Sequence, residues 1–203
     1  MSLSFGEDRS FVSYSDPGGP LLVDSVRRLR PRVVMWQGLE RYDAVEQIVD
    51  VAREVGAVLF VDPQSSTHSL ASPRIRELLG RIDVFAPNER EAILLTGDDD
   101  IDRAEGSLVQ STRLVVLKPG SCGAVAADLD GRLAVPAIPV QAIETTGAGD
   151  CFNAGFVMAW VESEDIVGCL QAGNAAGGLS TLAPSSEGIP VRSAVDLARA
   201  AFG

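Results

Sequence analysis

Short β-rich runs alternate with helical patterns from Pro31 onward, and this alternation restricts the chain to few folds. Apolar, often β-branched runs predict buried strands at residues 32–38, 57–62, 82–86 and 114–118. Apolar residues at helical spacing predict helices at residues 42–55, 74–79 and 88–95. Strands that alternate with helices usually form a parallel sheet covered by helices, so we predict an α/β fold.

The alternation changes after residue 118. Asp130-Gly131 stands between two apolar runs at residues 123–128 and 132–137, which is a strong hairpin signal. Three further helices are predicted at residues 150–161, 165–182 and 192–202. We therefore predict one α/β domain over residues 31–203, with a mostly parallel sheet that an antiparallel hairpin extends.

Residues 1–30 differ from the rest of the chain. Residues 11–14 could form a strand, but the Pro- and Gly-rich stretch at residues 16–20 would break it at once. Little regular structure is predicted here, and we treat residues 1–30 as a remnant segment that precedes the domain.

The charge balance limits the classes of partner. The chain of 203 residues has a formal net charge of -11, whereas proteins that bind nucleic acid use clustered Lys and Arg. The three cysteines form no CxxC pair, which favours a reducing, cytoplasmic location. No apolar stretch has the length of a membrane helix, and no basic-then-apolar signal peptide opens the sequence. Neither nucleic acid nor a membrane is expected as a partner.

The most informative motif joins a glycine-rich turn to a predicted helix, at Gly147-Ala148-Gly149-Asp150. The glycines allow backbone angles at which successive N–H groups converge on the positive end of the helix, where an anion binds. Asp150 would stand beside that anion as a general base for a hydroxyl that attacks a phosphoryl group. The alternative is structural: Asp150 only caps the helix, and the glycines only form a tight turn.

This motif, with Thr145 and Thr146 before it and the sequence CFNAGF after it, resembles the signature of the PfkB, or ribokinase-like, carbohydrate kinases. The resemblance implies that Asp150 is the catalytic base and that the amides of Gly147, Ala148 and Gly149 form an anion hole. It implies ATP and Mg²⁺ as cofactors, with a monovalent cation such as K⁺ as a further candidate. Glu144 departs from the aspartate that usually begins the family motif.

Asn88 and Glu91 open a predicted helix and resemble the family's NxxE motif, which implies a role with magnesium and phosphate. Residues three apart share a helix face, and their oxygens are ligands of the kind that magnesium prefers. A capped, solvent-facing turn is the alternative. Lys118, Gly120 and Gly123 resemble the family's loop near the nucleotide, whereas a simple hairpin loop is the structural alternative.

Asn174 lies among small residues at 172–178 and resembles a family position that borders the adenine, although helix packing explains these small residues equally well. Asp62-Pro63-Gln64 resembles the strand-end DPN of related sugar kinases, with Gln64 in place of asparagine. His68, the only histidine, excludes a multi-histidine metal site and is expected in a loop. The acidic run at residues 98–100 predicts a helix start rather than a metal site.

The resemblance begins near Asp8, and the N-terminal third of the family, with its early strands, sugar pocket and lid, has no counterpart. We therefore expect a ribokinase-like layered fold that lacks those strands and the lid. The first functional hypothesis is a kinase that transfers the γ-phosphate of ATP to a sugar or sugar-like molecule, with a homodimer as a candidate assembly. The alternative is an inactive nucleotide-binding fragment. A Rossmann-type oxidoreductase ranks third because no strand-linked GxGxxG occurs.

Overall fold

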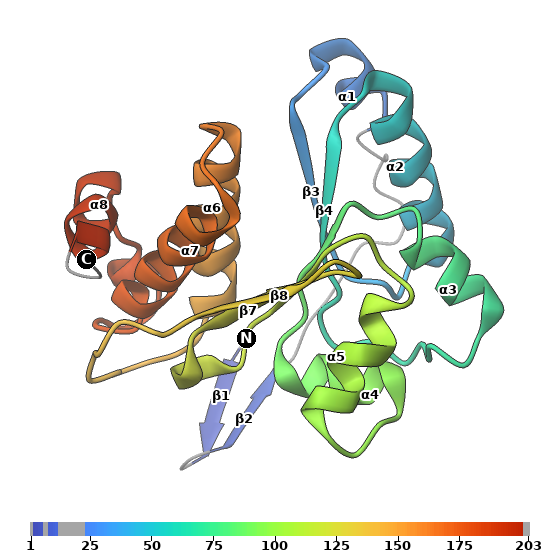
Figure 1. Cartoon of the computed structure of the whole chain (residues 1–203). Helices are drawn as coiled ribbons and strands as arrows, with labels where there is room; N and C mark the ends of the chain where they lie inside the picture. The colour runs from blue at the N-terminus through green and yellow to red at the C-terminus, as the bar shows by residue number, and fades with distance from the viewer. Residues whose placement is uncertain (1, 6–7, 12–22, 201–203) are drawn as a thin grey trace.

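The computed structural model describes residues 2–5, 8–11 and 23–200, and its centre is a six-stranded sheet in the order β3-β4-β5-β6-β7-β8 (Figure 1). The six strands are β3 (Val33–Gln37), β4 (Val58–Asp62), β5 (Val84–Phe85), β6 (Val115–Leu117), β7 (Ala124–Ala127) and β8 (Arg132–Val135). Strands β3 to β6 are parallel, and β7 and β8 extend the sheet as an antiparallel hairpin. The predicted α/β class and the predicted hairpin are confirmed.

Helices cover the sheet in two layers (Figure 1). One layer contains α2 (Tyr42–Val55), α3 (Pro73–Leu79), α4 (Glu89–Thr96) and α5 (Ile101–Val109). The other contains α6 (Ala148–Val161), α7 (Ile166–Ser180) and α8 (Arg192–Ala200). Two 3-10 helices, η1 (Gly120–Cys122) and η2 (Ser185–Gly188), lie in loops. Helix α2 has the predicted bounds, and the other predicted helices differ by a few residues at their ends, except that positions 201 and 202 of the last one lie outside the described residues.

The N-terminal residues contain more regular structure than predicted. Strands β1 (Ser2–Phe5) and β2 (Asp8–Phe11) form a separate antiparallel pair, and α1 (Val23–Leu29) packs on α2. The candidate strand at residues 11–14 lies mostly outside the described residues. Helix α1 is not predicted; it has seven residues, and tertiary contacts such as those of buried Val26 stabilise it. The division at residue 30 stays a prediction.

Strand β4 shows how the sheet is buried on both faces. Leu59 and Val61 belong to the apolar cluster under α2 to α5, whereas Phe60 packs with Phe156 of α6 on the other face. Burial on both faces is typical of parallel strands between helix layers. Because β3 to β6 are parallel, their carboxyl ends meet at one edge of the sheet, where open α/β sheets usually bind ligands.

Helices α6 and α7 approach each other closely because glycines lie between them. A Cβ atom at Gly155 would stand 2.5 Å from the carbonyl oxygen of Ala172, and one at Gly173 would stand 2.7 Å from the Phe152 ring. At Gly177 the nearest atom would be the carbonyl oxygen of Ala148, at 3.0 Å. Helix packing therefore accounts for Gly173 and Gly177 in the small-residue stretch.

We predict that Gly155→Ala lowers the free energy of unfolding by about 1–3 kcal/mol, because the added methyl group has no room between the two backbones. Gly106→Ala is the matched control: Gly106 lies exposed within α5, and a Cβ atom there meets nothing within 4 Å. Its alanine should leave stability unchanged or raise it by less than about 1 kcal/mol. Urea denaturation measures both, and equal stability of the two variants would contradict the close packing.

Candidate functional site

A cavity of about 940 Å³ opens at the carboxyl edge of the parallel strands. Its lining brings together segments that are far apart in the sequence and contains ten residues to which the motifs assign a role in binding or catalysis. These are Asn88, Glu91, Lys118, Gly120, Gly123, Gly147, Ala148, Gly149, Asp150 and Asn174. Their roles stay predictions, but their convergence on one cavity is a property of the fold.

The start of α6 faces this cavity. Gly147 has a φ of 80°, a left-handed conformation that favours glycine, and as the N-cap residue it has no side chain with which to cap the helix. The N–H of Ala148 donates to the Thr145 carbonyl at 3.2 Å, so an anion would compete with this turn bond. Asp150 is exposed in the first turn of α6. The arrangement places the positive end of a helix beside a carboxylate.

Gln37 contacts Asp150 from the end of β3. Its Nε2 atom donates a hydrogen bond to Oδ1 of Asp150 at 2.6 Å. The bond fixes one carboxylate oxygen of Asp150, while the second oxygen keeps its capacity to accept a proton. The sequence motifs did not identify Gln37, although its place at the carboxyl end of a predicted parallel strand was a usable signal.

Behind the α6 start lies a buried polar group formed by Asp62, Lys118 and Asn153. Nζ of Lys118 donates to Oδ2 of Asp62 at 2.7 Å and to Oδ1 of Asn153 at 3.1 Å. Nδ2 of Asn153 donates to the same Asp62 oxygen at 2.6 Å. Two of the three ammonium protons of Lys118 are therefore engaged, so a contact of this side chain with phosphate would depend on the third.

Asn88 and Glu91 form a reciprocal capping box at the start of α4. The N–H of Asn88 donates to Oε2 of Glu91 at 2.9 Å, and the N–H of Glu91 donates to Oδ1 of Asn88 at 2.8 Å. Burial raises the pKa of Glu91, and the charge of Asp62 acts in the same direction. Asn88 and Glu91 therefore do cap the helix, as the structural alternative predicts, and both residues also line the cavity.

Two glycines and Asn174 form another part of the cavity lining. Gly120 and Gly123 have φ values of 60° and 105°, and a Cβ atom at Gly123 would overlap the Val135 carbonyl oxygen at 2.1 Å. Nδ2 of Asn174 donates to the carbonyls of Val135 and Pro136, both at 3.0 Å. Asn174 therefore anchors the segment that follows β8, and its Oδ1 atom is the group left for a ligand.

Asn153 is a second functional candidate, which lies within the CFNAGF sequence but receives no role from the family resemblance. It lies three residues after Asp150, on the same face of α6, and is almost completely buried in a helix with otherwise apolar buried residues. A lone amide in such a helix was the available signal. The prediction for the acidic run is confirmed: Asp100 caps α5 by accepting from the N–H groups of Asp102 and Arg103. His68 lies outside any helix or strand, as expected.

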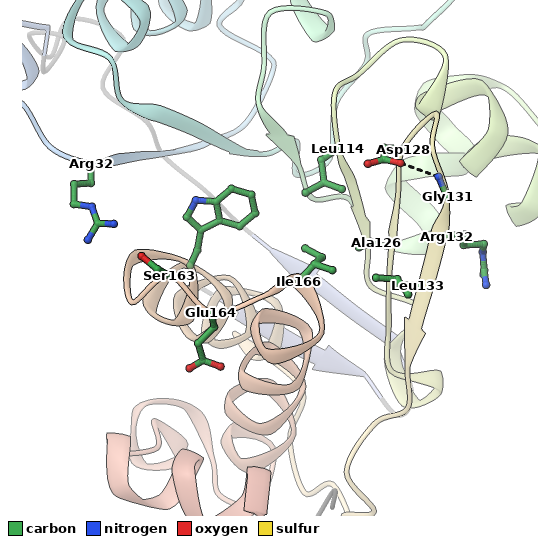
Figure 2. Close-up of a pocket in the computed structure, with 11 residues that line it drawn as sticks. Arg32, Leu114, Ala126, Asp128, Gly131, Arg132, Leu133, Ser163, Glu164 and Ile166 are labelled. Atoms are coloured by element: carbon green, nitrogen blue, oxygen red, sulfur yellow. Dashed lines mark hydrogen bonds between the residues drawn. The ribbon is translucent and has the colours of Figure 1, made fainter.

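A second cavity, of about 650 Å³, lies at the other end of the sheet (Figure 2). Arg32 and Leu114 precede β3 and β6, and Asp128 and Gly131 come from the hairpin turn. The N–H of Gly131 donates to Asp128, as the dashed line in Figure 2 marks. None of the ten predicted residues is among the described residues that line this cavity.

The described residues contain no group of three His, Cys, Asp or Glu side chains that could hold a metal ion. Within residues 2–5, 8–11 and 23–200, no helix combines the length and the apolar character that a membrane crossing requires.

Solved structures with the same fold include the ribokinase of Arabidopsis thaliana in complex with ribose and ATP. The TM-score is 0.77 at 27% identity, over 87% of this chain and 58% of that one. A further match is an E. coli protein provisionally assigned as ribokinase II, in complex with ATP and Mg²⁺. Its TM-score is 0.66 at 26% identity, over 76% of this chain and 52% of that one.

Among curated relatives, an ATP-dependent ribose-1-phosphate kinase of Halopiger xanaduensis is 30% identical over 87% of this chain. The chain spans 57% of the length of that relative. The family profile described as pfkB family carbohydrate kinase matches residues 37–191, a stretch that contains all ten cavity residues named from the motifs. The chain belongs to the pfkB family of carbohydrate kinases.

Proposed function

We propose that this protein transfers the γ-phosphate of ATP to a hydroxyl group of a sugar or sugar-like small molecule. One observation supports this most strongly: the exposed Asp150 carboxylate stands in the first turn of a helix whose N-cap residue is a glycine, in a cavity of about 940 Å³. A general base beside an anion site is what phosphoryl transfer to a hydroxyl requires.

In the proposed reaction Asp150 accepts the proton of the acceptor hydroxyl as its oxygen attacks the γ-phosphorus. The bond from the γ-phosphorus to the bridging oxygen breaks, and ADP leaves with that oxygen. The amides of Gly147, Ala148 and Gly149 stabilise negative charge on the transferring group. The bond from Gln37 to Asp150 keeps the base in a fixed orientation during the attack.

The nucleotide fits the wall that contains Lys118, Gly120, Gly123 and Asn174. Ile138, Pro139 and Val140 also line this cavity and supply apolar surface suited to an adenine ring. The donor chemistry fits magnesium that is held mainly by phosphate and water, with Asn88 and Glu91 as hard oxygen partners. When bound, magnesium would neutralise charge on the phosphates.

We infer the class of the acceptor molecule from the similar proteins. The Arabidopsis structure contains ribose, and the Halopiger relative is named a ribose-1-phosphate kinase. A nucleoside is the second class of acceptor that we consider. A homodimer, a monovalent cation such as K⁺ and a cytoplasmic location are further expectations. The alternative function is an inactive nucleotide-binding fragment, and acceptor-dependent turnover separates the two.

We predict that Asp150→Asn lowers the turnover number by about 10² to 10⁴ while ATP affinity stays nearly unchanged, because the variant loses only the general base. The measurement is ADP release with magnesium and ATP over a panel of sugars and nucleosides. Asp130→Asn serves as the control because Asp130 is exposed and lies outside the cavity lining. Equal turnover in Asp150→Asn and wild type would rule out the assigned base, and ATP binding without release in wild type would favour the fragment.

We further predict that Glu91→Gln raises the magnesium concentration needed for half-maximal turnover, because the amide is a weaker oxygen ligand than the carboxylate. Glu89→Gln is the matched control: Glu89 stands in the same first turn of α4 but is exposed and outside the cavity lining. A magnesium titration of the three proteins tests this. Superimposable curves for wild type and Glu91→Gln would refute the magnesium role.

A further inference from the structure

The buried polar group of Asp62, Lys118 and Asn153 joins three separate elements of the fold. Asp62 ends β4, Lys118 follows β6, and Asn153 lies in α6. The side chains of Asp62 and Lys118 are each only 10% exposed, and Asn153 is 1% exposed as a residue. Each of the three side chains bonds to both others, which satisfies buried groups that would otherwise destabilise the fold.

Asn153 is the member that ties α6 to the sheet. It lies one turn after Asp150, so the bonds that hold its side chain also restrain the turn that carries the base. Gly149 stands over the same group, since a Cβ atom there would be 3.9 Å from Nζ of Lys118. The apolar contacts of Phe152 and Phe156 bury α6, but apolar burial has no preferred direction, whereas hydrogen bonds do.

The charges within the group argue for a positioning role. The ammonium of Lys118 lies against the carboxylate of Asp62 at 2.7 Å, so a large part of its charge is compensated before any phosphate arrives. Among the described lining residues Lys118 is the cationic one, beside the carboxylates of Asp62, Glu91 and Asp150. A lysine that served mainly to attract phosphate would attract it more strongly without a buried carboxylate partner.

We propose that Asp62, Lys118 and Asn153 are positioning residues that fix the first turn of α6, and with it Asp150 and the neighbouring amides, over the carboxyl edge of the sheet. The proposal rests on the function proposed above and adds the residues that hold its reacting groups in place. Misplacement of a catalytic group by about 1 Å can lower a rate about 100-fold.

Asn153→Leu tests the proposal most directly. It removes the link from α6 and leaves the bond between Lys118 and Asp62 in place. The turnover number should fall about 10- to 100-fold, and the KM for ATP should change less than about threefold, because the nucleotide wall is intact. Phe156→Leu is the matched control, since Phe156 is fully buried on the same helix and has no polar link to the site. It should lose stability and keep its turnover number.

A second variant keeps the proposal testable if Asn153→Leu does not fold. Asp62→Leu/Lys118→Met/Asn153→Leu removes all three polar groups together, and such apolar replacement often preserves stability. Amide hydrogen exchange at Cys151, whose N–H donates to the Gly147 carbonyl at 2.9 Å, reports on the first turn without requiring turnover. Exchange at Cys151 should become faster in both variants, while residues 156–161 keep their protection.

The outcomes separate this proposal from the proposed function. Unchanged exchange at Cys151 in a folded variant overturns the positioning role, whether or not the wild type is an active kinase. Faster exchange with wild-type turnover number overturns it as well, because the first turn would then be loosened without effect on the reaction. If the wild type shows no acceptor-dependent turnover, the kinase function fails, and the exchange measurement alone decides whether the three residues fix the α6 start.

Discussion

The parallel pairing of β3 to β6 is the constraint on which the rest of the structure depends. Parallel strands bring their carboxyl ends to one edge, so Gln37, Asp62 and Lys118 meet there although they are far apart in the sequence. The hairpin of β7 and β8 then returns the chain so that α6 starts above the same edge. Asp150 and the neighbouring amides are consequently placed by the α6 start, and Gln37, which holds Asp150, is placed by the end of β3.

Much of this arrangement follows from local sequence patterns. The period of apolar residues predicts α2 at its observed bounds, and Asp130-Gly131 predicts the hairpin. Helix α1 is not predicted, and its seven residues depend on tertiary contacts such as the packing on α2. In the site, the GAGD turn and the NxxE pair are local motifs and visible in the sequence. Gln37 contacts Asp150 at a distance of 113 positions in the sequence, and Asn153 contacts Lys118 and Asp62 at distances of 35 and 91 positions. Local signals can mark these two residues, but they do not reveal their partners.

The electrostatics of the cavity explain why an acidic chain can be proposed to bind a triphosphate. The lining holds the carboxylates of Asp62, Glu91 and Asp150, and the ammonium of Lys118 is largely engaged by Asp62. Attraction by free cationic side chains is therefore weak here. Backbone amides at a helix start bind anions without a net positive charge, and magnesium would supply the remaining compensation. Partial burial raises the pKa of Glu91, and the nearby charge of Asp62 adds to this effect.

The exposure of the Asp150 side chain matters for the distinction between an active kinase and an inactive nucleotide-binding fragment. A base that can deprotonate a sugar hydroxyl can also activate water, so an active kinase must favour the acceptor by position or by excluding water. In the described residues Asp150 is held by Gln37 but remains exposed. Covering this carboxylate is then a task for the bound acceptor or for parts of the protein beyond these residues. The ratio of acceptor-dependent to acceptor-independent ADP release therefore measures whether Asp150 activates an acceptor hydroxyl, as in a kinase, or only water.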